Sequence, residues 1–120
     1  MSSKSFLSLL ILLLFSSFAK AQEKLDVFDV ARKGNAQQAV EIIKTDVKAF
    51  NTKNENGFSP LILACYRGNN EVAKVLIENN CDLNVKSEMG TALMACIVKG
   101  NNEIASLLIQ KKVDINLIDD

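Results

Sequence analysis

Aliphatic residues recur at intervals of three and four along parts of the chain, the spacing that places side chains on one face of an α-helix. Two such stripes follow each other: Leu61, Ala64 and Cys65, then Val72, Val75 and Leu76. Ser59 and Pro60 precede the first stripe and Gly68 follows it. A hydroxyl cap, a proline in the first turn and a terminal glycine are typical helix boundaries. The pattern therefore predicts two short helices joined by a tight turn.

This helical pair is repeated along the chain. The sequence GNNEVAKVLIENNCDLN starts at Gly68, and GNNEIASLLIQKKVDIN starts 32 residues later at Gly100. A more divergent copy, VARKGNAQQAVEIIK from Val30, aligns with ACYRGNNEVAKVLIE from Ala64. Short helices cannot bury their apolar faces alone, so copies are expected to stack on one another. The sequence predicts an all-α solenoid of three units, at about residues 25–53, 54–86 and 87–120.

The units resemble the ankyrin repeat. The matching residues of the second unit are Gly57, Ser59, Pro60, Leu61, Ala64, Gly68, Glu71, Val72, Leu76, Asp82 and Asn84. Those of the third unit are Thr91, Leu93, Gly100, Glu103, Ile104, Leu108, Asp114 and Asn116. The resemblance implies an ankyrin repeat solenoid of helix-turn-helix repeats, with short β-hairpin-like turns between them.

The chain also departs from the family pattern. Ile62 and Met94 replace the family's histidine in the first turn of the inner helix. Gly90 stands directly before Thr91, whereas one residue separates Gly57 from Ser59. Because the third unit is one residue shorter here, its hairpin tip is expected to be displaced or tightened. In the first unit, Gln38 stands where the second unit has a valine, which suits a terminal repeat facing water.

The first 21 residues have the features of a secretory signal peptide. Lys4 precedes an apolar run from Phe6 to Phe18, and Ala19-Lys20-Ala21 forms a small-residue cleavage motif. The apolar run would cover only about 20 Å as a helix, less than the roughly 30 Å hydrocarbon core of a bilayer. We expect cleavage after residue 21, a mature domain at 22–120, export to the periplasm or the exterior, and no stable membrane span afterwards.

Charge and composition argue against several classes of function. The whole chain has 14 basic and 14 acidic residues, and removal of Lys4 and Lys20 leaves 12 basic residues in the mature part. This balance does not favour a nucleic-acid partner, whose backbone requires a clustered basic surface. The chain has no histidine, which excludes mixed Cys/His zinc sites and the usual Ser-His or Cys-His catalytic pairs. We expect no enzymatic activity, no metal and no cofactor.

The cysteines leave an alternative open. Cys65, Cys81 and Cys96 are an odd number and match no redox or disulfide framework. The simplest interpretation is that small buried thiols replace alanine. A bridge between Cys65 and Cys96 needs α-carbons within about 7 Å, whereas packed helices lie roughly 8–10 Å apart. The alternative is a thiol-based protein associated with oxidative stress.

The family resemblance implies a protein–protein interaction module that scaffolds or regulates a partner, using turn tips and the exposed side of the inner helices. The corresponding candidates are Glu55, Asn56, Phe58, Tyr66, Arg67, Val98 and Lys99, with Arg32 and Lys33 at the matching positions of the first unit. A further alternative is a structural subunit that self-associates through its third unit, because no polar capping helix follows that unit in the sequence.

Overall fold

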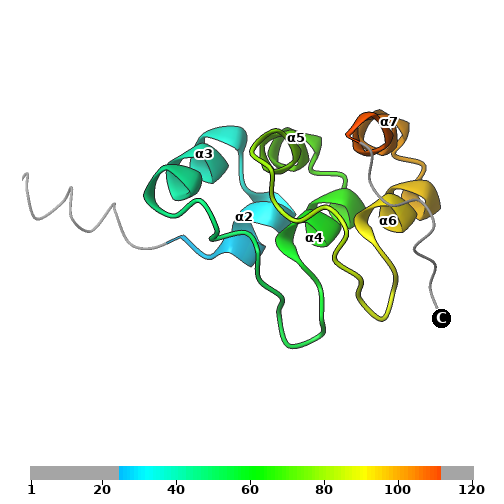
Figure 1. Cartoon of the computed structure of the whole chain (residues 1–120), viewed down its shortest axis with the longest axis horizontal. Helices are drawn as coiled ribbons and strands as arrows, with labels where there is room; N and C mark the ends of the chain where they lie inside the picture. Colours follow the sequence, from blue (N-terminus) through cyan, green and yellow to red (C-terminus); the bar gives the residue numbers. More distant parts are fainter. Residues whose placement is uncertain (1–24, 112–120) are drawn as a thin grey trace, which may run out of the picture.

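The computed structural model describes residues 25–111, which form six α-helices. Their bounds are α2 Val27–Lys33, α3 Ala36–Thr45, α4 Pro60–Arg67, α5 Asn70–Glu78, α6 Ala92–Lys99 and α7 Asn102–Gln110. Helices α2, α4 and α6 lie side by side as an inner layer, and α3, α5 and α7 form an outer layer above them (Figure 1). The predicted solenoid of three helical pairs is confirmed in this part of the chain.

Two predictions fall outside the described residues. The signal peptide at 1–21 is one of them, and the family matches Asp114 and Asn116 of the third unit are the other. Both stay predictions from the sequence.

Hydroxyl side chains start the second and third inner helices. The Ser59 hydroxyl accepts a hydrogen bond from the Ile62 N–H at 3.2 Å, and the Thr91 hydroxyl accepts one from the Met94 N–H at 3.3 Å. Each bond satisfies an N–H that has no partner within the helix. Pro60 occupies the first turn of α4, as predicted.

The inner helices end at glycine in two different ways. Gly68 and Gly100 adopt the left-handed conformation, with φ of 71° and 69°. Gly34 also follows its helix, but its backbone is extended, with φ of −84°. Glycine is favoured at this position for steric reasons, because a β-carbon at Gly34 would lie 2.7 Å from the backbone of Val30. After the end of α5, Asn80 is left-handed with φ of 60°.

The repeated Asn-Asn-Glu sequence connects neighbouring repeats. Asn69 caps α5 by accepting from the Val72 N–H, while its side-chain amide donates to the carbonyls of Ala31 at 3.0 Å and Gly34 at 3.1 Å. Glu71 accepts a hydrogen bond from the Ala36 N–H at 2.9 Å. The start of α5 is therefore fastened to the first repeat as well as capped.

The third repeat uses the same residues with different partners. The Asn101 side chain donates to the Asn70 side-chain oxygen at 2.7 Å, and Asn70 donates to Glu103 at 3.1 Å. Lys74 also forms an ion pair with Glu103. The hydrogen bond with Lys74 lowers the pKa of Glu103 and raises that of Lys74.

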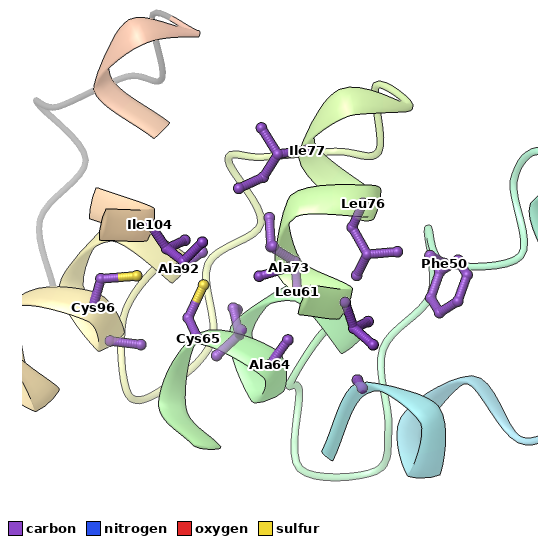
Figure 2. Packing of buried hydrophobic residues seen from close by; sticks show 14 of the residues in the cluster. Phe50, Leu61, Ala64, Cys65, Ala73, Leu76, Ile77, Ala92, Cys96 and Ile104 are labelled. Carbon is purple, nitrogen blue, oxygen red and sulfur yellow. The ribbon is translucent and has the colours of Figure 1, made fainter. Parts of the chain in front are cut away.

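The hydrophobic core lies between the two layers and runs through all three repeats. Leu76, Ile77, Ile104 and Leu108 are the largest aliphatic side chains with no exposed surface. Figure 2 shows Leu76 and Ile77 pointing in different directions from α5, with the small residue Ala73 one turn earlier on the same helix. Small side chains at such positions let neighbouring helices approach closely, so each repeat covers the apolar face of the next.

The turns between repeats differ in length, as predicted. In the second repeat the Asn54 N–H donates to the Phe58 carbonyl at 2.9 Å. In the third repeat Ser87 and Gly90 exchange two backbone hydrogen bonds of 3.0 Å, which closes a four-residue turn. The missing residue before the third inner helix thus tightens the tip.

Gln38 has a local role that its position did not predict. Its side-chain oxygen accepts a hydrogen bond from the Asn35 N–H at 3.0 Å, and the Asn35 side chain accepts one from the Gln38 N–H at 2.9 Å. This reciprocal capping box starts α3. The polar residue at this position therefore stabilises the helix start and is half-buried.

Candidate functional site

Four of the seven predicted partner-binding residues lie in the last turns of two adjacent inner helices. Tyr66 and Arg67 end α4, and Val98 and Lys99 end α6. All four side chains are exposed, Tyr66 to 43% and Val98 to 75%. Because α4 and α6 pack against each other, these residues belong to one surface, which we call the inner-helix surface.

A direct contact joins the two repeats across this surface. The Lys99 ammonium nitrogen lies 4.3 Å from the centroid of the Tyr66 ring. Such cation–π contacts are worth about 0.5–1 kcal/mol at exposed sites. The contact orients an exposed aromatic ring and a cation together, and both groups stay accessible.

The remaining predicted residues lie on the turn before α4. Glu55 and Asn56 are exposed within it. The segment between α3 and α4 extends to the side of the inner helices away from the outer layer (Figure 1). Phe58 is half-buried and packs against the hydrophobic core. Its N–H donates to the Asn54 side chain at 3.0 Å. Phe58 therefore holds its own turn in place and offers only part of its ring to a partner.

The first repeat contributes cations to the same edge. Arg32 and Lys33 end α2, which packs beside α4. The Arg32 guanidinium forms an ion pair with Asp29 at 3.1 Å. Lys33 is exposed.

Sequence reasoning missed several exposed apolar residues, among them one on α6, one on the turn before it and one on α7. Ile97, Met89 and Ile109 are exposed to 66%, 63% and 56%. Ile97 occupies the repeat position of Cys65, and Ile109 that of Ile77, and both of these equivalents are completely buried. The 32-residue repeat could have predicted the exposure of Ile97 and Ile109, because the third repeat covers the equivalent residues of the second repeat.

The thiols lie inside the stack. Cys65 and Cys96 are completely buried, and their sulfur atoms point toward each other between α4 and α6 (Figure 2). Cys65, Cys81 and Cys96 are all free thiols. A hydrogen bond with Cys96 and burial raise the pKa of Cys65, and burial raises that of Cys81 to about 12. Such thiols are protonated at neutral pH and are weak nucleophiles.

Within residues 25–111, no group of three or more histidine, cysteine, aspartate or glutamate side chains is arranged to hold a metal ion. None of the helices in that range is both long enough and apolar enough to cross a bilayer. The Asp82 carboxylate accepts a hydrogen bond from the Asn84 N–H at 3.0 Å, which gives this residue a structural role.

Comparisons with known proteins agree with the geometry. The family model described as "Ankyrin repeats (3 copies)" matches residues 27–119. The chain is 37% identical over 59 residues to the ankyrin repeat and SAM domain-containing protein 6 of Danio rerio, covering 49% of this chain and 8% of that protein. It is 37% identical over 57 residues to the acyl-CoA-binding domain-containing protein 6 of Bos taurus, covering 48% and 20%. The chain thus spans a small part of these relatives.

A solved structure shares the fold. It is a chain in the complex of the predatory endopeptidase Bd0816 from Bdellovibrio bacteriovorus with the immunity protein Bd3460. The match has a TM-score of 0.69 at 21% identity and covers 81% of this chain and 51% of that chain. At this identity the likeness concerns the fold alone.

Proposed function

The chain belongs to the ankyrin repeat family, and we propose that it is an exported protein-binding module that scaffolds or regulates another protein through its inner-helix surface. Ankyrin repeats generally act as protein–protein interaction modules, which supports the binding role. The export step rests on the signal-peptide features of residues 1–21. A mature protein that begins at Gln22 is the expected result of mass spectrometry on the cell envelope or medium.

The contact between Tyr66 and Lys99 is the observation that carries the proposal. It places a tyrosine and cations from two repeats on one exposed surface, next to Val98. Tyrosine and arginine dominate the energetics of protein interfaces because they combine large contact area with directed polar groups. The solved complex that shares this fold is itself an assembly of two proteins, which fits a binding role.

We expect the double variant Tyr66→Ala with Arg67→Ala to lose its partner in a pull-down from the exporting cell's envelope. A residue that anchors an interface contributes about 2 kcal/mol or more, so the affinity should fall roughly thirty-fold for one such residue and about a thousand-fold for two. Both side chains are exposed, so the free energy of unfolding should change by only about 1 kcal/mol for the pair.

The matched control is Val40→Ala with Lys44→Ala, which removes one apolar residue and one cation from the outer helix α3. Its recovery of partners should equal that of the wild type. Equal recovery by both double variants would mean that the inner-helix surface is not the binding surface.

The two alternative roles have less support in the described residues. Cys65 and Cys96 are completely buried, so a role for these two thiols requires the stack to open first. Thiol titration before and after mild peroxide separates that role from binding. End-to-end stacking would bury Asp29 and Gln38 of the first repeat, which occupy the positions of the buried Ala95 and Ile104. Burying a carboxylate in this way is costly.

A further inference from the structure

The inner-helix surface carries a row of cations, one from each repeat. Lys33, Arg67 and Lys99 are the last residues of α2, α4 and α6, and each stands directly before the glycine that ends its helix. All three side chains are exposed. The inner helices lie side by side in Figure 1, so equivalent positions form a line across the repeats. We call these three residues the basic row.

Charge is distributed unequally between the two helical layers. The inner helices carry four cationic side chains and a single carboxylate, Asp29. That carboxylate is paired with Arg32, so it does not neutralise the basic row. The outer helices carry four glutamates and two lysines. The protein therefore presents a positive inner layer and a negative outer layer, although the whole chain is balanced.

The basic row has no acidic partner among residues 25–111, where the ion pairs are Arg32 with Asp29 and Lys74 with Glu103. Lys99 contacts the Tyr66 ring, which leaves its charge uncompensated. The three cations are consequently available to an external anion.

The helix dipole does not by itself explain the basic row. A cation in the last turn of a helix is stabilised by the partial negative charge there. The same argument applies to the outer helices, yet only α3 has a basic residue, Lys44, in its last turn, and α5 and α7 have none. Cations are thus concentrated at the ends of the layer that carries the exposed tyrosine and valine.

Building on the proposed function, we infer that the partner docks an extended acidic segment along the basic row, with apolar residues against Tyr66 and Val98. Packed helices lie roughly 8–10 Å apart. A polyproline II segment has three residues per turn and rises about 3.1 Å per residue, so carboxylates at every third position lie on one face about 9 Å apart and would match this spacing. The segment would run across the inner helices from the first repeat to the third.

A synthetic peptide tests this inference directly. The peptide has aspartate at every third position with proline and valine between, which favours the polyproline II conformation, and its control has the same composition with the aspartates gathered at one end. Binding of each to the mature protein is measured by fluorescence anisotropy at low and high salt. We expect tighter binding of the spaced peptide and weakening by salt, because exposed charges are screened.

Two charge-neutralising variants locate the site. Arg67→Gln with Lys99→Gln should weaken the spaced peptide about two- to thirty-fold, the range for two exposed ion pairs. Lys44→Gln with Lys48→Gln removes the same charge elsewhere and should leave binding unchanged. Equal loss in both variants, or equal affinity for the two peptides, would overturn the inference.

The experiment also separates this inference from the proposed function. Single-stranded DNA and phosphatidylserine vesicles of matched charge serve as competitors for the captured partner. If either displaces the partner as efficiently as the spaced peptide does, the inference that the ligand is an acidic protein segment is overturned. If the captured partner depends on Tyr66 but is not displaced by the spaced peptide, the binding role holds and the acidic chemistry is wrong. If no partner depends on Tyr66, the proposed function itself fails.

Discussion

Replacing Ile77 with alanine is expected to lower the free energy of unfolding by about 2–5 kcal/mol. The Ile77 side chain is completely buried in α5 of the central repeat, so truncation leaves a cavity and removes apolar contacts. Domains of this size are typically stable by only about 5–15 kcal/mol, so the loss is a large fraction of the total. Urea unfolding followed by circular dichroism measures the difference.

The chain offers a matched control in Ile109→Ala. Ile109 is the same residue at the same position of the third repeat, but it is exposed to 56%. Its truncation should change the free energy of unfolding by about 0.5 kcal/mol or less, as is usual for surface substitutions. Similar losses for the two variants would show that burial between stacked repeats does not distinguish these positions.

The second large effect is expected for Asn69→Ala, with a loss of about 1–3 kcal/mol. This substitution removes the cap of α5 and also the amide that donates to the carbonyls of Ala31 and Gly34. Those carbonyls lie at the end of α2, so the first repeat should be loosened together with the second. Thermal unfolding and urea unfolding both report the change.

Asn69→Ser separates the two contributions. Serine can cap a helix nearly as well as asparagine, but its hydroxyl cannot replace an amide that donates to two carbonyls. We expect the serine variant to recover only part of the lost stability. Complete recovery would mean that the hydrogen bonds between repeats contribute nothing measurable.

Local features of the fold were predictable because they depend on nearby residues. Ser59 and Thr91 cap the helices that follow them, and the left-handed Gly68 and Gly100 end the inner helices. Each of these depends on backbone groups within a few residues. The 32-residue repeat then indicated that equivalent helices stack, which defined the inner and outer layers.

Features that depend on contacts between repeats were less accessible. The hydrogen bonds from Asn69 to the end of α2 join residues 35 or more positions apart, which no local pattern could predict. The exposure of Ile97 was also missed, because the equivalent residue of the second repeat, Cys65, is buried against the third repeat. Burial in a solenoid thus depends on which repeat follows, as well as on the local pattern.

The candidate site was predictable in position and not in detail. Tyr66, Arg67, Val98 and Lys99 were assigned to one surface from the family resemblance, and the structure places them on adjacent helix ends. The contact between Lys99 and the Tyr66 ring depends on the side-chain geometry of two repeats. That these residues bind a partner stays a prediction.

Amide hydrogen exchange tests the central claim, that the inner-helix surface binds the partner, most directly. The mature protein would be measured alone and in complex with the protein that it captures from the envelope. We predict slower exchange in the last turns of α4 and α6, around Tyr66 and Lys99, and unchanged exchange in α3, α5 and α7. Protection confined to the outer helices would contradict the claim.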